Sequence, residues 1–397
     1  MIDTSAPAAL DGIRVLDFSQ MMLGPFATQI LGDLGADVIK VERPVAGEWE
    51  RSLAMGGEML NGTSAAFLAM NRNKRSIAVD LKAAGARDAL LALAATCDVV
   101  VENFRPGVLE RAGLGYDDIR AVRPDVVYCS GTGWGRDTPY ARQGRPGQDL
   151  LIQAMTGLAA NAGRDGDPPV LSGSSISDST AALTLANGVL AALLARERHG
   201  IGQRVEVDLF SATIAVMCQE ISAMVNQRQD FPRSEAGVAQ PWSAAPYGFY
   251  RAADGWVALA MGSLAVLADV LGDPELAALD PWVDRDEAKR RIDAAVEGRP
   301  TADVVDALLA GGLWAAQVRT MGEAVEELRA DGSDLLVRVE HPEVGELELV
   351  GCPIRLSRTP WRLSRRPPTV GEHTDEVLAD VLDADQLAAL RTAGALG

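Results

Sequence analysis

The chain has 397 residues, of which 48% are hydrophobic, and this is enough for two domains with substantial cores. Lys and Arg number 37 against 55 Asp and Glu, so the formal net charge is −18. Such an acidic balance argues against nucleic-acid binding, which needs a basic face. An anionic ligand would have to be met by a local cluster of basic residues.

The start of the chain and its rarer residues indicate the compartment. Residues 1–10 lack the basic and apolar regions of a secretory signal, and no stretch approaches the ~20 apolar residues of a membrane-spanning helix. We therefore expect a cytoplasmic protein with no membrane partner. The cysteines form no CxxC pair and predict buried thiols rather than disulfides; they are Cys97, Cys129, Cys218 and Cys352. The histidines lie far apart in sequence, so no metal site is expected.

Strand and helix signals alternate in the first part of the chain. Short apolar strands are predicted at 13–18, 37–42, 98–102 and 126–130, with helices at 27–34, 81–95 and 117–122. This alternation predicts a parallel sheet covered by helices on both faces. Ligands of such sheets gather beyond the carboxyl ends of the strands. The loops that follow the strands are therefore the expected positions of functional residues.

The second half begins with the longest helical pattern, 179–198, which Gly200 ends. After it come an extended segment at 204–208, an apolar helix to about 225, a polar linker at 227–245 and a strand at 256–260 that opens a smaller α/β section. Strands at 335–340 and 345–350 precede a tail, 352–372, that has too little apolar content to fold alone and is expected to run back over the first domain. The predicted domains are a large one made of 1–225 and 331–397, and a linker with a small domain at 226–330.

A single carboxylate stands at the start of the long helix. Asp178 ends the string LSGSSISD, directly before the apolar helical pattern. Unpaired N–H groups in a first turn, together with the helix dipole, favour the ionised form of such a side chain. An ionised carboxylate that faces a ligand can act as nucleophile or base. The alternative is that Ser177 or Asp178 only caps the helix, because Ser and Asp are favoured caps.

Two basic segments could hold phosphate groups. The string NRNKRS (71–76) lies between a small-residue helix and a strand, and ENFRPG (102–107) directly follows a strand, with Arg111 one helical turn further on. Arg and Lys suit phosphate, and Phe104 could stack on a flat ring. With both segments expected at the same sheet edge, a polyphosphate ligand is predicted. The alternative is that their charges are merely solvated.

Other common motifs are incomplete or absent. GTGWG (131–135) follows a strand, but Arg136 stands where a dinucleotide fingerprint needs its third glycine. The sequence holds no Walker A lysine motif, no HExxH and no GxSxG. Standard nucleotide hydrolysis, zinc proteolysis and serine esterase chemistry therefore lack their main residues.

In this order the segments resemble the family III CoA-transferases, the superfamily of formyl-CoA transferase, carnitine CoA-transferase and α-methylacyl-CoA racemase. The matching strings include GIRVLDFSQMMLGPFATQILGDLGADVIKVERP, NRNKRSIAVDL, VVVENFRPGVLERAGLGYDDI, GRPGQDLLIQAMTG, ISDSTAALTLANGVLAALLARERHGIGQRVEVDLF and GEHTDEVL. The likeness covers nearly the whole chain. It implies an α/β fold with a Rossmann-like large domain built on a parallel sheet, a smaller α/β domain, and two ring-like subunits interlocked as a homodimer.

The resemblance also implies coenzyme A, bound as acyl-CoA, and no metal. The family's CoA-binding segments match Arg43, Asn73, Lys74, Arg75, Asn103, Phe104, Arg105 and Arg111, and its catalytic aspartate matches Asp178. The implied reaction moves CoA from an acyl-CoA to a free carboxylic acid. In it, Asp178 forms a mixed anhydride with the acyl group and then an aspartyl-CoA thioester, which the acceptor acid attacks.

Two alternative functions remain. The racemase branch uses a His in a Gly-His-Asp string, where this chain has Gly147, Gln148 and Asp149. A glutamine amide cannot shuttle protons near pH 7, so the transferase is favoured. The other alternative is an acyl-CoA-binding protein without turnover.

The acid whose acyl group is bound to CoA is expected to be larger than formate or oxalate. Leu53 and Ala66 stand where the formyl branch has aromatic pocket residues, and only Gly237 remains of its glycine-rich loop. Trp134 and Gln148 are placed in the substrate pocket. The alternative is that Trp134 belongs to the core and Gln148 only pins a loop.

Overall fold

The computed structural model describes residues 6–397, which form two compact units. The first unit comprises the chain up to Ile152, Ser175–Thr213 and Gly332–Gly397, and the second comprises Gln153–Ser174 and Ile214–Asp331. Segments 153–174 and 214–225 thus belong to the smaller unit, whereas the sequence boundaries put them in the large domain. The domain limits of the protein stay a prediction.

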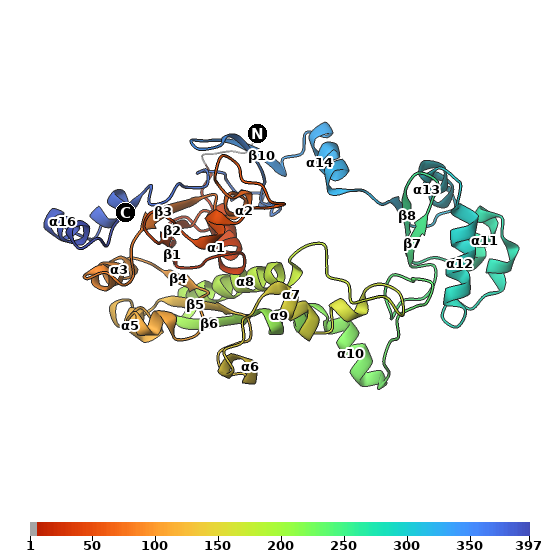
Figure 1. Ribbon diagram of the computed structural model, residues 1–397, viewed down its shortest axis with the longest axis horizontal. Coiled ribbons are helices and arrows are strands. Elements are labelled where there is room, and N and C mark those ends of the chain that lie inside the picture. Colours follow the sequence, from red (N-terminus) through yellow and green to blue (C-terminus); the bar gives the residue numbers. More distant parts are fainter. Residues whose placement is uncertain (1–5) are drawn as a thin grey trace. The chain divides into compact units, whose positions relative to one another are not determined.

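A six-stranded parallel sheet organises the first unit (Figure 1). Its strands are β1 (Arg14–Asp17), β2 (Asp37–Glu42), β3 (Lys74–Ala78), β4 (Val99–Glu102), β5 (Val127–Thr132) and β6 (Gln203–Asp208). Every neighbouring pair is parallel, in the order β3-β2-β1-β4-β5-β6. This is the strand order of Rossmann folds, in which the order reverses between β1 and β4 and ligands bind at that reversal. The predicted parallel sheet is confirmed.

Helices cover both faces of this sheet. They are α1 (Leu23–Asp33), α2 (Ala65–Met70), α3 (Ala86–Ala94), α4 (Val108–Arg111), α5 (Tyr116–Val122), α6 (Pro139–Arg142), α7 (Asp149–Met155), α8 (Ile176–His199), α9 (Leu209–Val216), α15 (Thr374–Ala379) and α16 (Ala384–Thr392), with a 3-10 turn, η1, at Trp49–Ser52. Alternate strand residues point to opposite faces. Val15, Val99 and Val127 therefore pack with α1 and α8, whereas Leu16 and Val100 pack with α3, α5, α15 and α16.

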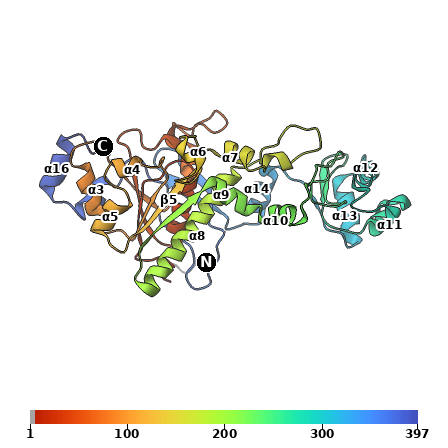
Figure 2. The same ribbon diagram turned by 90° about the horizontal axis from the view of Figure 1, so that it is seen from below.

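The helix α8 lies along the sheet, beside β5 in Figure 2. Gly200 ends it with the left-handed φ of 67°, as the sequence predicts. Its length and apolar composition would allow it to cross a membrane, and it is the one unbroken helix of which this holds among the residues described. The expectation that no stretch reaches this length is therefore too strict. Leu185 and Val189 are fully buried and join the core between α8 and the sheet.

The second unit is a smaller α/β body. An antiparallel sheet of β7 (Gly248–Arg251), β8 (Trp256–Leu259) and β9 (Ala315–Gln317) packs with α11 (Leu264–Leu271), α12 (Arg285–Val296) and α13 (Thr301–Ala310). The unit also contains α10 (Cys218–Gln227), α14 (Met321–Ala330), η2 (Ala159–Asn161) and η3 (Pro274–Ala278). The predicted strand at 256–260 is confirmed, and 228–247 holds no helix or strand beyond an isolated bridge.

The carboxyl-terminal part of the chain lies against the first unit. The hairpin of β10 (Leu336–His341) and β11 (Gly345–Val350) packs on α2. The irregular tail that follows is held by backbone hydrogen bonds, from Arg362 N–H to the Asp33 carbonyl and from Asn73 N–H to the Arg365 carbonyl. The tail therefore runs back over the first unit, where its polar backbone finds partners that it could not supply itself.

Candidate active site

Asp178 lies in the first turn of α8 but does not cap it. The cap residue is Ser175, which makes no side-chain cap bond. The carboxylate of Asp149, at the start of α7, caps the helix instead, because its Oδ1 accepts hydrogen bonds from Ser177 N–H at 2.8 Å and from Asp178 N–H at 3.3 Å. The capping alternative for Ser177 and Asp178 is therefore wrong. A cap that arrives from a distant segment leaves no signal in the local string.

The charge state expected for Asp178 is also wrong. Burial, followed by the negative charge of Asp149, raises the pKa of Asp178 to about 7. The N–H groups that were expected to favour the ionised form are already bonded to Asp149, whose charge opposes a second carboxylate. At neutral pH the protonated and ionised forms of Asp178 are therefore comparably populated.

A cavity of about 390 Å³ lies at the carboxyl ends of β4 and β5. It brings together four of the predicted CoA-binding residues, which are Asn103, Phe104, Arg105 and Arg111. Arg105 and Arg111 are exposed, and no acidic side chain among the described residues pairs with either of them. Two unpaired guanidinium groups beside an aromatic ring suit a ligand that carries phosphates and a flat ring.

Asn103 joins two of the loops at this sheet edge. Its side-chain amide accepts a hydrogen bond from Gln20 N–H at 2.9 Å and donates one to the Gln20 carbonyl at 2.7 Å. Gln20 follows β1 and Asn103 follows β4, so the pair spans the point where the strand order reverses. Asn103 therefore fixes the edge at which the cavity opens.

The cavity has one basic residue that sequence reasoning missed. Arg145 lines it, with its guanidinium 5.0 Å from the ring centre of Tyr140. Arg145 belongs to the string GRPGQD, which leads into α7. From this string, only Gln148 was predicted as a site residue. Asp178 and Arg43 do not line this cavity. Gly147 does, and it stands two residues before the Asp149 that caps α8.

Trp134 serves the core and the cavity at once. It is 5% exposed, donates a hydrogen bond from Nε1 to the Pro146 carbonyl at 3.2 Å, and packs 4.9 Å from the ring of Tyr140 and 5.9 Å from that of Phe210. The residue also lines the cavity. Gln148 is exposed and outside that lining. The substrate-pocket roles of both residues stay predictions.

The other basic segment lies elsewhere. The strand β3 begins at Lys74, so the loop ends at Asn73 and precedes a parallel strand, whereas 103–107 follows one. The two segments therefore lie at opposite ends of the parallel strands, and the expectation of a shared sheet edge is wrong. The sequence places this strand after Ser76, but it begins at Lys74, because hydrophobic periodicity does not detect its opening Lys and Arg.

Each predicted CoA residue of this segment has partners inside the protein. Lys74 is fully buried and donates to Asp17 Oδ2 at 3.2 Å and to the Asn71 side chain at 2.9 Å. Asn73 bonds Asp33 and the tail at Arg362 and Ser364. Arg75 pairs with Asp37 and Glu376. Their role in binding CoA stays a prediction, as does that of Arg43, which is exposed and donates to the Gly47 carbonyl.

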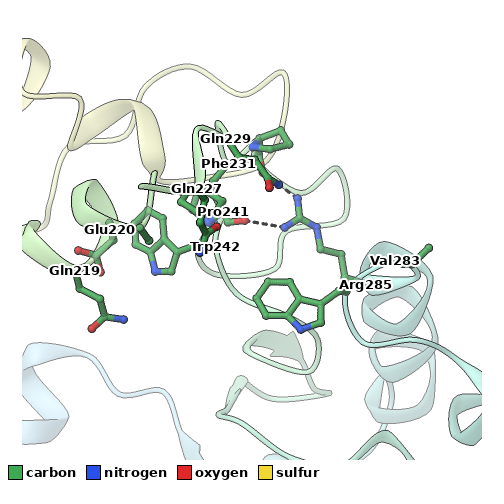
Figure 3. Close-up of a pocket in the computed structure, with 12 residues that line it drawn as sticks. Gln219, Glu220, Gln227, Gln229, Phe231, Pro241, Trp242, Val283 and Arg285 are labelled. Atoms are coloured by element: carbon green, nitrogen blue, oxygen red, sulfur yellow. Dashed lines mark hydrogen bonds between the residues drawn. The ribbon is translucent and has the colours of Figure 1, made fainter. Parts of the chain in front are cut away.

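The second unit contains a cavity of its own, of about 630 Å³ (Figure 3). It lies between α10, the irregular segment 229–242 and the start of α12. Arg285 donates to the carbonyls of Pro241 at 2.8 Å and Pro232 at 2.9 Å, and so holds this segment against α12. None of the predicted site residues lines it.

The strand order, the arginine-rimmed cavity at the carboxyl ends of β4 and β5, and the half-buried carboxylate on α8 define a doubly wound α/β protein with a ligand site. Comparison with known proteins extends this. Residues 10–374 match the model of CoA-transferase family III.

The chain is also similar to individual proteins over nearly its whole length. It is 33% identical to succinyl-CoA:glutarate CoA-transferase from Mus musculus, covering 97% of this chain and 89% of that one. It is 34% identical to succinyl-CoA:mesaconate CoA-transferase from Haloarcula hispanica, covering 93% and 96%. A CAIB/BAIF family protein from Brucella suis superposes with a TM-score of 0.82 at 28% identity, covering 95% and 100%. The chain belongs to CoA-transferase family III and is an enzyme of that family, which confirms the resemblance seen in its sequence.

Proposed function

We propose that this enzyme moves CoA from an acyl-CoA to a free carboxylic acid through covalent intermediates on Asp178. One observation supports this most directly. Asp178 is a half-buried carboxylate in the first turn of a long helix, with a pKa of about 7 and no cation from residues 6–397 paired to it. A carboxylate that is neither solvated nor neutralised by a salt bridge retains its nucleophilicity when it ionises.

The proposed cavity residues bind the CoA part of the substrate. Arg105, Arg111 and Arg145 offer guanidinium groups to phosphates, and Phe104 offers a ring face to the adenine. The segment from Gly147 to Asp149 joins the cavity wall to the cap of α8. This connection supports the proposal that a thioester extends from the cavity toward Asp178.

In the proposed reaction, a carboxylate oxygen of Asp178 attacks the thioester carbonyl, the carbon–sulfur bond breaks, and a mixed anhydride and CoA thiolate result. Attack of the thiolate on the aspartyl carbonyl releases the donor acid and leaves Asp178 as its CoA thioester. An acceptor carboxylate then attacks this carbonyl and releases the thiolate, and the thiolate takes the new acyl group. Asp178 thereby returns to its starting form, and no proton has to be removed from carbon.

The relatives suggest the substrate class. Their names pair succinyl-CoA with the dicarboxylic acids glutarate and mesaconate. We therefore propose succinyl-CoA as donor and a dicarboxylic acid as acceptor, acting in an interlocked homodimer. The racemase alternative needs a proton shuttle, which the amide of Gln148 does not provide.

Trapping would test the proposal. The protein is incubated with succinyl-CoA and then with hydroxylamine, and the modified residue is located by peptide mass spectrometry. We expect a hydroxamate on Asp178 and none in Asp178→Asn. An unmodified Asp178 during measurable CoA exchange would refute the mechanism. Epimerisation of a 2-methylacyl-CoA without exchange would favour the racemase, and light scattering of the purified protein tests the dimer.

A further inference from the structure

A second carboxyl group lies at the same edge of the sheet as Asp178, on a different element. Glu50 belongs to the 3-10 turn η1, which follows β2, and its residue is 2% exposed. Its Oε2 atom is buried and makes no hydrogen bond within residues 6–397. A buried carboxyl oxygen without a partner is costly to the fold. Such a group in a well-packed region indicates that something outside the resting structure uses it.

The neighbouring cations are engaged by other acids. Lys40 forms an ion pair with Glu48 Oε1 at 2.9 Å and donates to the Ser19 carbonyl, and Glu48 Oε2 accepts from Met21 N–H. Lys74 is bonded to Asp17. No hydrogen bond or ion pair joins Glu50 to either lysine among the described residues, so Glu50 has no direct counter-ion.

Glu50 is therefore neutral in the resting enzyme. Burial, followed by the charge of Glu48, raises the pKa of Glu50 to about 8, against the weaker opposing effect of Lys40 and Lys74. The negative charge of Asp178 acts on Glu50 in the same direction as that of Glu48. The topology agrees with this, because η1 follows β2 and the far end of α8 leads into β6, so η1 and the start of α8 both lie at the carboxyl edge of the parallel sheet. The helix α2, which packs on η1, carries no titratable side chain.

We propose that Glu50, as a neutral carboxylic acid, donates a hydrogen bond to the carbonyl oxygen of acylated Asp178 while that oxygen carries negative charge. This inference rests on the proposed covalent role of Asp178. Each attack on the aspartyl carbonyl turns its oxygen into an oxyanion, and each collapse restores the carbonyl. The proton stays on Glu50 throughout, so only the strength of the hydrogen bond changes.

A neutral donor suits this reaction better than a cation or a carboxylate. A buried lysine would form a salt bridge with Asp178 and weaken it as a nucleophile. An ionised Glu50 would repel both the oxyanion and the incoming acceptor carboxylate. A protonated carboxylic acid stabilises the oxyanion and leaves the resting nucleophile free.

Two substitutions distinguish the loss of the hydrogen-bond donor at position 50 from the loss of its ionisation. Glu50→Gln keeps a donor of the same size that does not ionise, and Glu50→Leu removes the donor. We expect Glu50→Leu to lower kcat of CoA exchange about 10²–10³-fold, as removal of one oxyanion donor does elsewhere. We expect Glu50→Gln to retain activity within about 10-fold of the wild type. In the wild type, kcat should fall as the pH rises above about 8, the pKa of Glu50, and Glu50→Gln should lose this alkaline fall.

The pH profile also excludes a purely structural role. Lys74, whose pKa burial lowers to about 8, is the other buried group that titrates in this range. An alkaline fall that persists in Glu50→Gln would assign the titration to Lys74 and overturn the proposal. So would wild-type kcat in Glu50→Leu. The Glu50→Gln profile still decides if Glu50→Leu does not fold, which circular dichroism would show. Hydroxylamine trapping in the wild type tests Asp178 separately, so failure of its covalent role would not be confused with failure of Glu50.

Discussion

Two basic segments of this enzyme look equivalent in the sequence and differ in the structure. Lys74 is fully buried and bonded to Asp17, at the start of β3. Arg105 and Arg111 are exposed and line the cavity after β4. The acids that engage the first segment lie 38 to 301 positions away within the same unit, as the Arg75–Asp37 and Arg75–Glu376 bonds show. Whether a cation is available to a ligand therefore depends on distant partners, and the local count of charges does not reveal it.

The comparison extends to the carboxylates. Burial works to raise the pKa of Asp17, but the charges of Lys74 and Lys40 and the hydrogen bonds from Ser19 and Thr28 lower it below its usual value. Asp178 is partly shielded from water, and the charge that acts on it is that of another carboxylate, so its pKa rises to about 7. Removal from water thus accompanies a structural ion in one place and a titrating group in the other, according to the sign of the neighbouring charge.

Removing the buried cation should have the largest effect. Lys74→Met keeps the side-chain length but leaves the buried charge of Asp17 without its ion-pair partner, which costs about 3–5 kcal/mol of unfolding free energy. Denaturation with urea measures this loss. Lys82→Ala, at an exposed position, is the control and should change stability by less than about 0.5 kcal/mol. A Lys74→Met protein of unchanged stability with a raised KM for acyl-CoA would instead assign Lys74 to CoA binding.

Removing a cavity cation should weaken substrate binding and leave the stability of the fold unchanged. Arg111→Ala should raise KM for acyl-CoA about 10- to 100-fold, since one charge-assisted hydrogen bond to phosphate is worth about 1.5–3 kcal/mol. The urea midpoint should stay unchanged, because no acid depends on this guanidinium. Arg120→Ala, which is exposed and outside the cavity lining, should leave KM unaltered. An equal rise of KM in Arg111→Ala and Arg120→Ala would mean that acyl-CoA binding depends only on long-range charge and not on a contact with Arg111.

The sequence predicts those features whose signal is local. Apolar runs located β2 to the residue and β1, β4 and β5 to within two residues, and the string ENFRPG located four residues of the cavity wall. The start of β3 was placed too late because its first two residues are charged and become buried only through Asp17, Asp37 and Glu376. The cap by Asp149 and the raised pKa of Asp178 were missed for the same reason, since both depend on side chains that meet only after folding.

The smallest predicted effect concerns the charge next to Asp178. Asp149→Asn keeps an oxygen that can cap α8, because Asn is as good a cap as Asp, but removes the negative charge that helps to raise the pKa of Asp178. Attack on the thioester needs ionised Asp178, so kcat/KM in the wild type should rise with pH through about 7. In Asp149→Asn this rise should move to lower pH by less than about one unit, because burial, the larger cause, remains. Glu58→Gln, an exposed carboxylate of the same unit, should leave the profile in place. A shift toward higher pH in Asp149→Asn would mean that Asp149 favours the ionised form of Asp178, and the difference between the paired and unpaired carboxylates would no longer hold.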